Sequence, residues 1–200
     1  MRRFVVLGQK ARARPDFLLA DIPSTSGRLD VLLHALRAAL LVSHGVRRDT
    51  TVYLALLGEA AAPRTLRIDG SAARYLRPDE RSLATTLKKA LSVDCEGASF
   101  VEARSGICVA VGGMDVLRSE LAGTCLYLLE QQGADIRGLA LSEQQDVTFV
   151  LGDHLGIGAE LRAEWLELGA VPVSVGPTQL HTQDVITLVA NELDRRGKSE

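Results

Sequence analysis

The chain has 200 residues, of which 46% are hydrophobic and 4% aromatic, and its formal net charge is −2. This length suits one domain with a mostly aliphatic core. No apolar run approaches the roughly 20 residues of a membrane helix, and the amino terminus lacks the apolar core of a signal peptide. We therefore expect a soluble, cytoplasmic protein without a membrane partner.

The three cysteines Cys95, Cys108 and Cys125 are odd in number and lack a C-x-x-C spacing. The sequence therefore predicts neither a disulfide framework nor a zinc site, and we expect no metal.

Charge is distributed unevenly along the chain. Residues 1–92 carry 16 Lys and Arg against 8 Asp and Glu, a net charge of +8, whereas residues 93–200 carry 7 against 17, a net charge of −10. A basic half favours a polyanionic partner, because cationic side chains displace counterions from a phosphate backbone. The alternative is ordinary solvated surface charge.

Hydrophobic periodicity divides the basic half into strands and helices. We expect, in chain order, a strand at 3–7, a polar segment at 8–14, a loop at 21–27, a helix at 28–42, a strand at 51–57, a strand at 63–69 and a helix at 78–91. The 51–57 run is nearly all apolar, which is typical of a strand buried on both faces, whereas 63–69 alternates as an exposed or edge strand does. His34 lies beside the apolar face of its helix, so we interpret it as structural rather than catalytic.

The second half continues the alternation of strands and helices. We expect a connector at 93–105, a strand at 106–112, a helix at 114–121, a strand at 124–129, a strand at 148–151, a helix at 159–168, a strand at 171–175 and a helix at 180–193. Strands alternating with helices indicate an α/β domain with a mainly parallel sheet.

Two glycine-bearing loops follow the last two predicted strands. Gly152, Gly156 and Gly158 follow the first, and Gly176 with Pro177 follows the second. We expect the two strands to be parallel neighbours, so that both loops lie where open α/β sheets bind ligands. The spacing matches neither the G-x-G-x-x-G fingerprint nor a G-x-x-x-x-G-K-[ST] phosphate loop, which argues against NAD and ATP.

Several motifs, taken together and in order, carry a family resemblance over nearly the whole chain. They are Arg2-Arg3-Phe4, Pro15-Asp16-Phe17, Asp21-Ile22-Pro23, the SGRLD run at 26–30, the SHGVRRD run at 43–49, the YLRPDERS run at 75–82, LGDHLG at 151–156 and the S-x-G-P-x-x-L-H turn at 174–181. The chain resembles the SPOUT methyltransferases, and is most similar to the archaeal-type tRNA pseudouridine-54 N1-methyltransferase family.

The resemblance implies an α/β fold of SPOUT type, with a mainly parallel sheet flanked by helices and a deep carboxyl-terminal trefoil knot. Physical principles alone would not predict a knot. It also implies a single domain over 1–200, in which the basic half 1–92 faces RNA and the half 106–200 binds S-adenosylmethionine. The family works as a homodimer through the knot region.

By matching position, the resemblance assigns cofactor contacts to Leu129, Gly152, Gly156, Val175, Gly176, Pro177, Thr178, Gln179, Leu180 and Val185. The family commonly has cysteine where Val185 stands, after an H-x-x-H-C run that this chain replaces with His181-Thr-Gln-Asp-Val. Valine still offers backbone and apolar contact. A tryptophan in place of Gly152 is expected to fill the cofactor cleft while the fold persists.

The activity that the resemblance implies is S-adenosylmethionine-dependent N1-methylation of pseudouridine 54 in tRNA. The alternatives are an RNA-binding SPOUT-fold protein without turnover and methylation of another RNA, such as ribosomal RNA. Methyl transfer to a ring nitrogen needs alignment and one proton acceptor.

Each candidate residue has a structural alternative. The candidates for catalysis are Asp153, His154, Arg28 and Asp30, and those for RNA contact are Arg47, Arg48, Arg77, Arg81 and His181. Asp153 would otherwise cap the helix that follows, His154 would pack beneath its loop, and the arginines would be surface charges.

Overall fold

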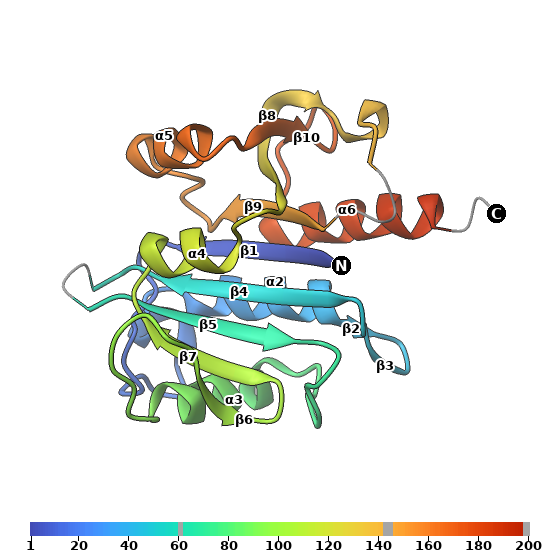
Figure 1. The fold of residues 1–200 in the computed structure, drawn as a ribbon. Helices are drawn as coiled ribbons and strands as arrows, with labels where there is room; N and C mark the ends of the chain where they lie inside the picture. Colours follow the sequence, from blue (N-terminus) through green and yellow to red (C-terminus); the bar gives the residue numbers. More distant parts are fainter. Residues whose placement is uncertain (60–61, 142–145, 198–200) are drawn as a thin grey trace.

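The structure is a computed structural model that describes residues 1–59, 62–141 and 146–197. Within these ranges, eight strands form one sheet (Figure 1). In chain order they are β1 (Arg2–Gly8), β4 (Thr50–Leu56), β5 (Arg64–Asp69), β6 (Val101–Arg104), β7 (Ile107–Val111), β8 (Cys125–Asp135), β9 (Val147–Gly152) and β10 (Val171–Ser174). Their order across the sheet is β10-β8-β9-β1-β4-β5-β7-β6. A separate two-stranded ribbon pairs β2 (Leu41–Val42) with β3 (Gly45–Val46).

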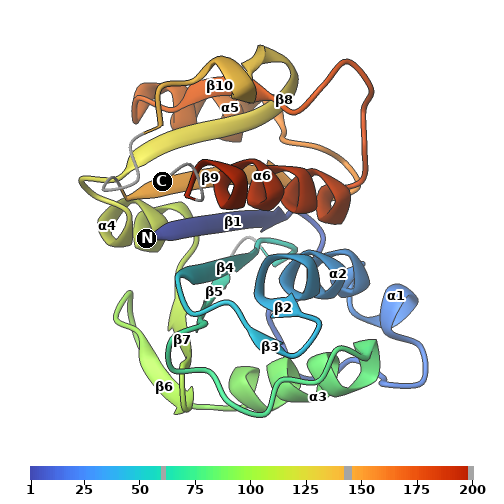
Figure 2. The same cartoon turned by 90° about the vertical axis from the view of Figure 1, so that its right-hand side faces the viewer.

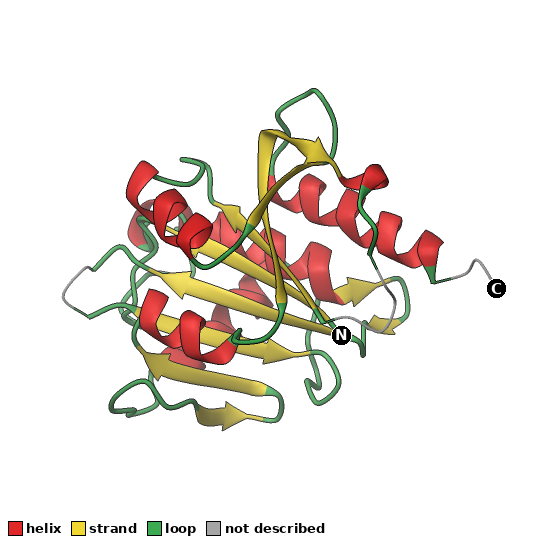
Figure 3. Cartoon of the chain, turned by 45° about the horizontal axis from the view of Figure 1, so that its top comes forward, coloured by secondary structure: helices red, strands yellow, loops and turns green. Residues whose placement is uncertain are grey.

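Helices cover both faces of the sheet (Figures 2 and 3). They are α1 (Ile22–Thr25), α2 (Leu29–Leu40), α3 (Glu80–Leu91), α4 (Met114–Glu120), α5 (Ala159–Glu167) and α6 (Thr182–Arg196), with a 3₁₀ turn η1 (Ile136–Gly138). On one face lie α2, α3 and α6, with α6 packed against α2. On the other lie α4 and α5 (Figure 3).

The sheet has a parallel part and an antiparallel part. From β10 to β4 every neighbouring pair is parallel, whereas the β4–β5, β5–β7 and β7–β6 pairs are antiparallel. The predicted α/β fold with a mostly parallel sheet flanked by helices is confirmed.

The alternation of side chains along β1 divides the core between the two faces of the sheet. Phe4 and Val6 pack in the cluster that includes the buried leucines of α2, and Val5 and Leu7 pack in the cluster that includes Trp165 of α5. All four β1 side chains are fully buried. Successive residues of a strand point to opposite faces, so a strand buried on both sides must be apolar throughout. The same reasoning correctly predicted β4, whose seven residues are all buried.

The prediction of an exposed or edge strand at 63–69 is wrong. β5 lies inside the sheet between β4 and β7, and Thr65, Leu66 and Ile68 are buried. The strand that does lie at the edge, β6, falls within the stretch predicted to be a connector. β6 has only four residues and its first two are exposed, so it lacks the hydrophobic pattern that marks a strand.

Two further expectations are corrected. β9 and β10 are not neighbours, because β8 lies between them and pairs in parallel with both. The predicted loop at 21–27 contains the single-turn helix α1. Asp21 caps it by accepting a hydrogen bond from the Ser24 backbone N–H at 3.3 Å, and Pro23 lies in its first turn, where a missing N–H is tolerated.

An ion-pair cluster holds α6 against the amino-terminal half. Arg47 donates two hydrogen bonds to the carboxylate of Asp194 on α6, at 2.8 and 2.7 Å, and Arg2 donates a third at 2.7 Å. Burial alone would raise the pKa of Asp194, but the hydrogen bonds from Arg47 and Arg2 outweigh it, so the pKa lies below its usual value. The cluster joins residues at opposite ends of the chain.

The described part of the chain holds no helix with the length and apolar character needed to cross a membrane. Nor do its described residues bring three or more His, Cys, Asp or Glu side chains together in a group that could hold a metal ion.

Candidate functional site

A cleft of about 1060 Å³ opens at the carboxyl ends of β8, β9 and β10. One wall comes from residues 129–131 within β8, from the loops after β9 and β10 and from the start of α6, and the opposite wall comes from the start of α2. The carboxyl ends of parallel strands meet at one edge of a sheet, which is why segments more than 100 residues apart in sequence line the same cleft.

The expected cofactor residues lie together in this cleft. Those that line it are Leu129, Gly152, Gly156, Val175, Gly176, Thr178, Gln179, Leu180 and Val185. Pro177 is not among the lining residues, although it belongs to the same loop. β9 and β10 contribute their loops to one cleft even though β8 separates the strands.

The loop after β9, residues 152–158, is fastened by the carboxylate of Asp153. Its Oδ2 accepts a hydrogen bond from the Gln9 backbone N–H and its Oδ1 accepts one from the Leu155 backbone N–H, both at 2.9 Å. Asp153 is only 6% exposed. Gly158 is the N-cap residue of α5, so Asp153 does not cap that helix. The structural role of Asp153 is instead to hold the loop after β9 through these two hydrogen bonds.

Position 152 requires glycine because the backbone of Gly156 passes close to it, and not because a ligand needs the space. A Cβ atom at this position would lie 1.9 Å from the carbonyl oxygen of Gly156. The expectation that tryptophan at 152 would leave the fold intact is therefore wrong, because even alanine would collide with backbone.

The loop after β10, residues 175–181, is open by comparison. Gly176 has φ of +154°, and a Cβ atom there would meet nothing within 4 Å. Two hydrogen bonds hold the loop. Gln131 donates one to the Pro177 carbonyl within the loop at 2.7 Å, and Thr182, which follows the loop, donates one to the Gly152 carbonyl at 2.8 Å. The second contact ties the start of α6 to the loop after β9.

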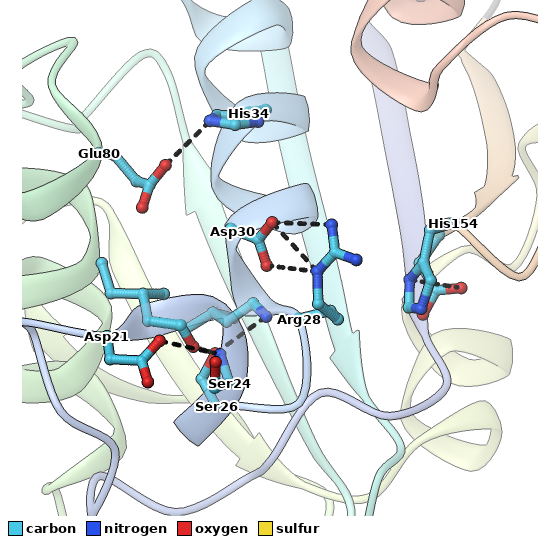
Figure 4. A network of polar contacts seen from close by, with 11 residues as sticks. Asp21, Ser24, Ser26, Arg28, Asp30, His34, Glu80 and His154 are labelled. Carbon is cyan, nitrogen blue, oxygen red and sulfur yellow. Dashed lines mark hydrogen bonds and ion pairs between the residues drawn. The ribbon is translucent and has the colours of Figure 1, made fainter.

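The opposite wall is built around Arg28 and Asp30 at the start of α2 (Figure 4). Arg28 Nε and Nη2 donate to the two carboxylate oxygens of Asp30, each at 3.0 Å. These hydrogen bonds, with the negative charge of Asp30, raise the pKa of Arg28 above its ordinary value. Arg28 has φ of 68° and ψ of 37°, a left-handed backbone that is unusual for a residue with a side chain.

Ser26 fixes the backbone that carries this pair. Its hydroxyl donates to the Ile22 carbonyl at 2.6 Å and accepts from the Leu29 backbone N–H at 3.0 Å. Ser26 is fully buried, so this side chain joins α1 to the first turn of α2. The arrangement places the guanidinium of Arg28 on the side of the cleft that faces His154 (Figure 4).

His154 lies in the cleft and not beneath its loop. It lines the cleft with a side chain that is 27% exposed, and its Nδ1 is 3.8 Å from Asp153 Oδ1, beyond hydrogen-bonding distance. Its Nδ1 is therefore not hydrogen-bonded to Asp153.

Three of the cleft residues that sequence reasoning missed carry polar side chains with intramolecular partners. His34 lines the cleft and hydrogen-bonds Glu80 of α3 through Nε2 at 3.0 Å (Figure 4). Its position four residues after Asp30 was a usable signal, because i and i+4 side chains share a helix face. Glu130 and Arg162 also line the cleft and pair through two hydrogen bonds of 2.8 and 2.9 Å, which lower the pKa of Glu130. No motif marked that pair.

The five residues expected to contact RNA are dispersed. His181 lines the cleft at the start of α6. Arg47 is paired with Asp194, and Arg48 donates to the backbone carbonyls of Gly70 and Ser71, so both have intramolecular partners. Arg77 and Arg81 are exposed near the start of α3, outside the cleft.

Comparison with known proteins adds independent observations. A family model of SAM-dependent RNA methyltransferases matches residues 1–198. The tRNA (pseudouridine(54)-N(1))-methyltransferase of Methanosarcina acetivorans is 42% identical over 195 residues, which is 98% of this chain and 92% of the relative. The enzyme of the same name from Halobacterium salinarum is 41% identical over 199 residues, 98% of either chain.

A solved structure supports the fold. The crystal structure of Archaeoglobus fulgidus Nep1 bound to S-adenosylhomocysteine superposes with a TM-score of 0.69 and covers 97% of both chains. The sequence identity is 17%, so the likeness concerns the fold alone.

Proposed function

The chain belongs to the tRNA (pseudouridine(54)-N(1))-methyltransferase family of SAM-dependent RNA methyltransferases, and from this membership we propose that it methylates N1 of pseudouridine 54 in tRNA. The observation that carries the proposal is similarity to such enzymes over 98% of the chain. The cleft supports it, because its lining residues come from both the predicted cofactor half and the predicted RNA-facing half.

The cleft residues suit S-adenosylmethionine, the cofactor of the family, which supplies a methyl group activated by a sulfonium. Gly156 and Gly176 line the cleft, and a Cβ atom at either position would meet open space, so backbone groups there can approach a ligand closely. Leu129 and Val185 offer apolar contact. Valine in place of the family's cysteine keeps that contact and removes a thiol.

The wall formed by Arg28 and Asp30 suits the target base. Loss of the N1 proton places negative charge on the neighbouring carbonyl oxygens of a pseudouridine, and a fixed guanidinium stabilises that charge. Asp30 holds Arg28 by two hydrogen bonds, so the guanidinium is oriented before the base arrives.

We assign the proton acceptor to His154 in preference to Asp153. Both oxygens of Asp153 already accept backbone hydrogen bonds and the residue is nearly buried. His154 lines the cleft with an accessible imidazole on the side facing Arg28.

The proposal includes the finer features of the family fold. We infer that the carboxyl-terminal segment forms the deep trefoil knot and that two copies associate through this region. The hydrogen bond from Thr182 to the Gly152 carbonyl supports the first, since it places the start of the last helix against the loop after β9. Leu155 and Leu180, which are 50% and 40% exposed at the cleft, supply apolar surface for a second copy. We place the activity in the cytoplasm.

Methyl transfer to defined RNAs tests the function. The protein is incubated with radiolabelled S-adenosylmethionine and with tRNA that carries either pseudouridine or uridine at position 54, and the nucleosides are identified by mass spectrometry. We expect N1-methylpseudouridine from the first tRNA alone. Binding of tRNA without methyl transfer would favour an RNA-binding protein without turnover. Methyl transfer to ribosomal RNA alone would favour an enzyme that acts on another RNA.

The role of His154 is tested by His154→Ala. General-base catalysis contributes about 10²- to 10⁴-fold to a rate, so kcat should fall in that range while the Kd for S-adenosylmethionine changes little. His44→Ala, which removes an exposed imidazole outside the cleft, serves as the control and should spare kcat. Equal kcat values for His154→Ala and the wild type would exclude His154 as the proton acceptor.

A further inference from the structure

The exposed segment 74–81, between β5 and the first turn of α3, presents an aromatic ring to solvent. Tyr75 is 84% exposed, which is unusual for a large side chain with apolar surface. Its φ is +59°, and within the described residues only Arg28, in the cleft wall, shares a positive φ without being glycine. Left-handed backbone at such a residue costs free energy and is concentrated at functional sites.

Three exposed arginines accompany this ring, one of which, Arg77, interacts electrostatically with Asp79. Arg74, Arg77 and Arg81 are exposed, and among the described residues none of their guanidinium groups makes a hydrogen bond or an ion pair. Two residues further along a chain lie at most about 7 Å away, so Arg74 and Arg77 flank Tyr75 closely. By contrast, Arg47 and Arg48 are held by Asp194 and by backbone carbonyls.

The segment is connected to the cleft through Glu80. Glu80 belongs to this segment as the first residue of α3, and it hydrogen-bonds His34, which lines the cleft. Figure 4 shows His34 on the same helix as Asp30, with Glu80 facing it from α3. Exposed positive charge and an aromatic ring are therefore connected to the cleft through the contact between Glu80 and His34.

We propose that Tyr75 is a stacking platform for a second, unpaired base of the tRNA substrate, with Arg74, Arg77 and Arg81 contacting phosphates on either side. The inference rests on the proposed function and adds a contact outside the catalytic cleft. An aromatic face stacks on any base, and neighbouring cations contact the backbone, which is the general pattern for single-stranded nucleic acid.

The test measures the Kd for tRNA by filter binding, with the Kd for S-adenosylmethionine measured in parallel by calorimetry. Tyr75→Ala should weaken tRNA binding by about 5- to 100-fold, the effect of one lost stacking contact. Tyr75→Phe should remain within about twofold of the wild type. Tyr75→Gly, which suits the backbone angle but lacks the ring, should weaken binding as alanine does. Affinity for S-adenosylmethionine should not change in any of the three.

Salt dependence separates the ring from the charges. Arg77→Ala with Arg81→Ala should reduce the slope of log K against log salt by roughly 1.4 to 1.8, whereas Tyr75→Ala should leave the slope unchanged. Wild-type tRNA affinity for Tyr75→Ala would overturn the proposal. The proposal would also be overturned if the molar mass of Tyr75→Ala in sedimentation were half that of the wild type, because the ring would then form a subunit contact. Failure of the proposed function has a different signature, namely no methyl transfer by the wild type.

Discussion

The two glycine-bearing loops of the cleft look alike in sequence and differ in construction. The loop after β9 is closed: Asp153 accepts two backbone hydrogen bonds, and Gly152 touches the Gly156 carbonyl. The loop after β10 is open: Gly176 faces empty space and residues 177–181 are exposed. In the first loop, glycine allows backbone to pack on backbone, and in the second it leaves room for a ligand.

Because the two loops are built differently, we expect substitutions in one loop to affect mainly stability and substitutions in the other to affect mainly ligand affinity. Changes in the closed loop should lower the free energy of unfolding first, and changes in the open loop should lower affinity for S-adenosylmethionine first. Four substitutions, taken from the largest expected effect to the smallest, test whether the two loops divide these tasks.

Gly152→Ala should have the largest effect on stability. Its methyl group would overlap the Gly156 carbonyl oxygen, so the loop must shift, at a cost of about 3 kcal/mol. For a chain of this size the Tm should fall by roughly 6–12 °C, as measured by calorimetry.

Gly176→Ala is the matched control, because its methyl group meets no atom and only the backbone angle costs about 1 kcal/mol. Its Tm should fall by only roughly 2–4 °C while its affinity for S-adenosylmethionine falls. Equal losses of Tm in the two variants would show that the loops are not built differently.

Asp153→Ala should rank next. It leaves the backbone N–H groups of Gln9 and Leu155 without their acceptor, and each of these partly buried hydrogen bonds contributes about 1 kcal/mol. We expect a loss of about 2 kcal/mol in urea unfolding. Asp153→Asn retains one acceptor oxygen and should recover part of it. If Asp153→Asn instead loses catalysis with full stability, Asp153 would be the proton acceptor and His154 would not.

Thr182→Val removes the hydrogen bond between the start of α6 and the Gly152 carbonyl while keeping the shape of the side chain. The loss should be about 1 kcal/mol, because the carbonyl is left without this donor. Thr187→Val, on the exposed side of the same helix, is the control and should cost less. A larger loss of stability for Thr187→Val than for Thr182→Val would show that the Thr182 hydrogen bond does not join the two loops.

Gln131→Ala should have the smallest effect on stability, within about 0.5 kcal/mol, because its hydrogen bond to the Pro177 carbonyl is exposed. The open loop loses one attachment, so the Kd for S-adenosylmethionine should rise by a few fold in calorimetry. Gln132→Ala, the neighbouring exposed residue, should leave both quantities unchanged. An unchanged Kd for Gln131→Ala would mean that this hydrogen bond does not position the loop.

Local sequence patterns correctly predicted the strands and helices whose burial is reflected in the pattern of apolar residues. The continuous apolar run of β4 and the leucine periodicity of α2 were sufficient, because burial on two faces and on one face leave different patterns. The motifs also located the cleft, since loops after parallel strands meet at one sheet edge.

Long-range partners left no such local pattern. Arg47 and Asp194 are 147 residues apart, and nothing near either residue indicates that they pair. The position of β8 between β9 and β10 depends on pairing across the whole sheet. Whether an arginine is bound internally or free for RNA was therefore not decidable from the sequence, because net charge counts arginines without regard to their partners.

The central position of β1 has a consequence for synthesis on the ribosome. β1 pairs with β4, and on its other side with β9, whose residues 147–152 are made some 140 residues later. Until then, one hydrogen-bonding edge of the first strand has no native neighbour, and the α2 surface that α6 covers stays bare. Such long-range closure slows folding, so the nascent polypeptide should need protection from aggregation until its last helix has emerged.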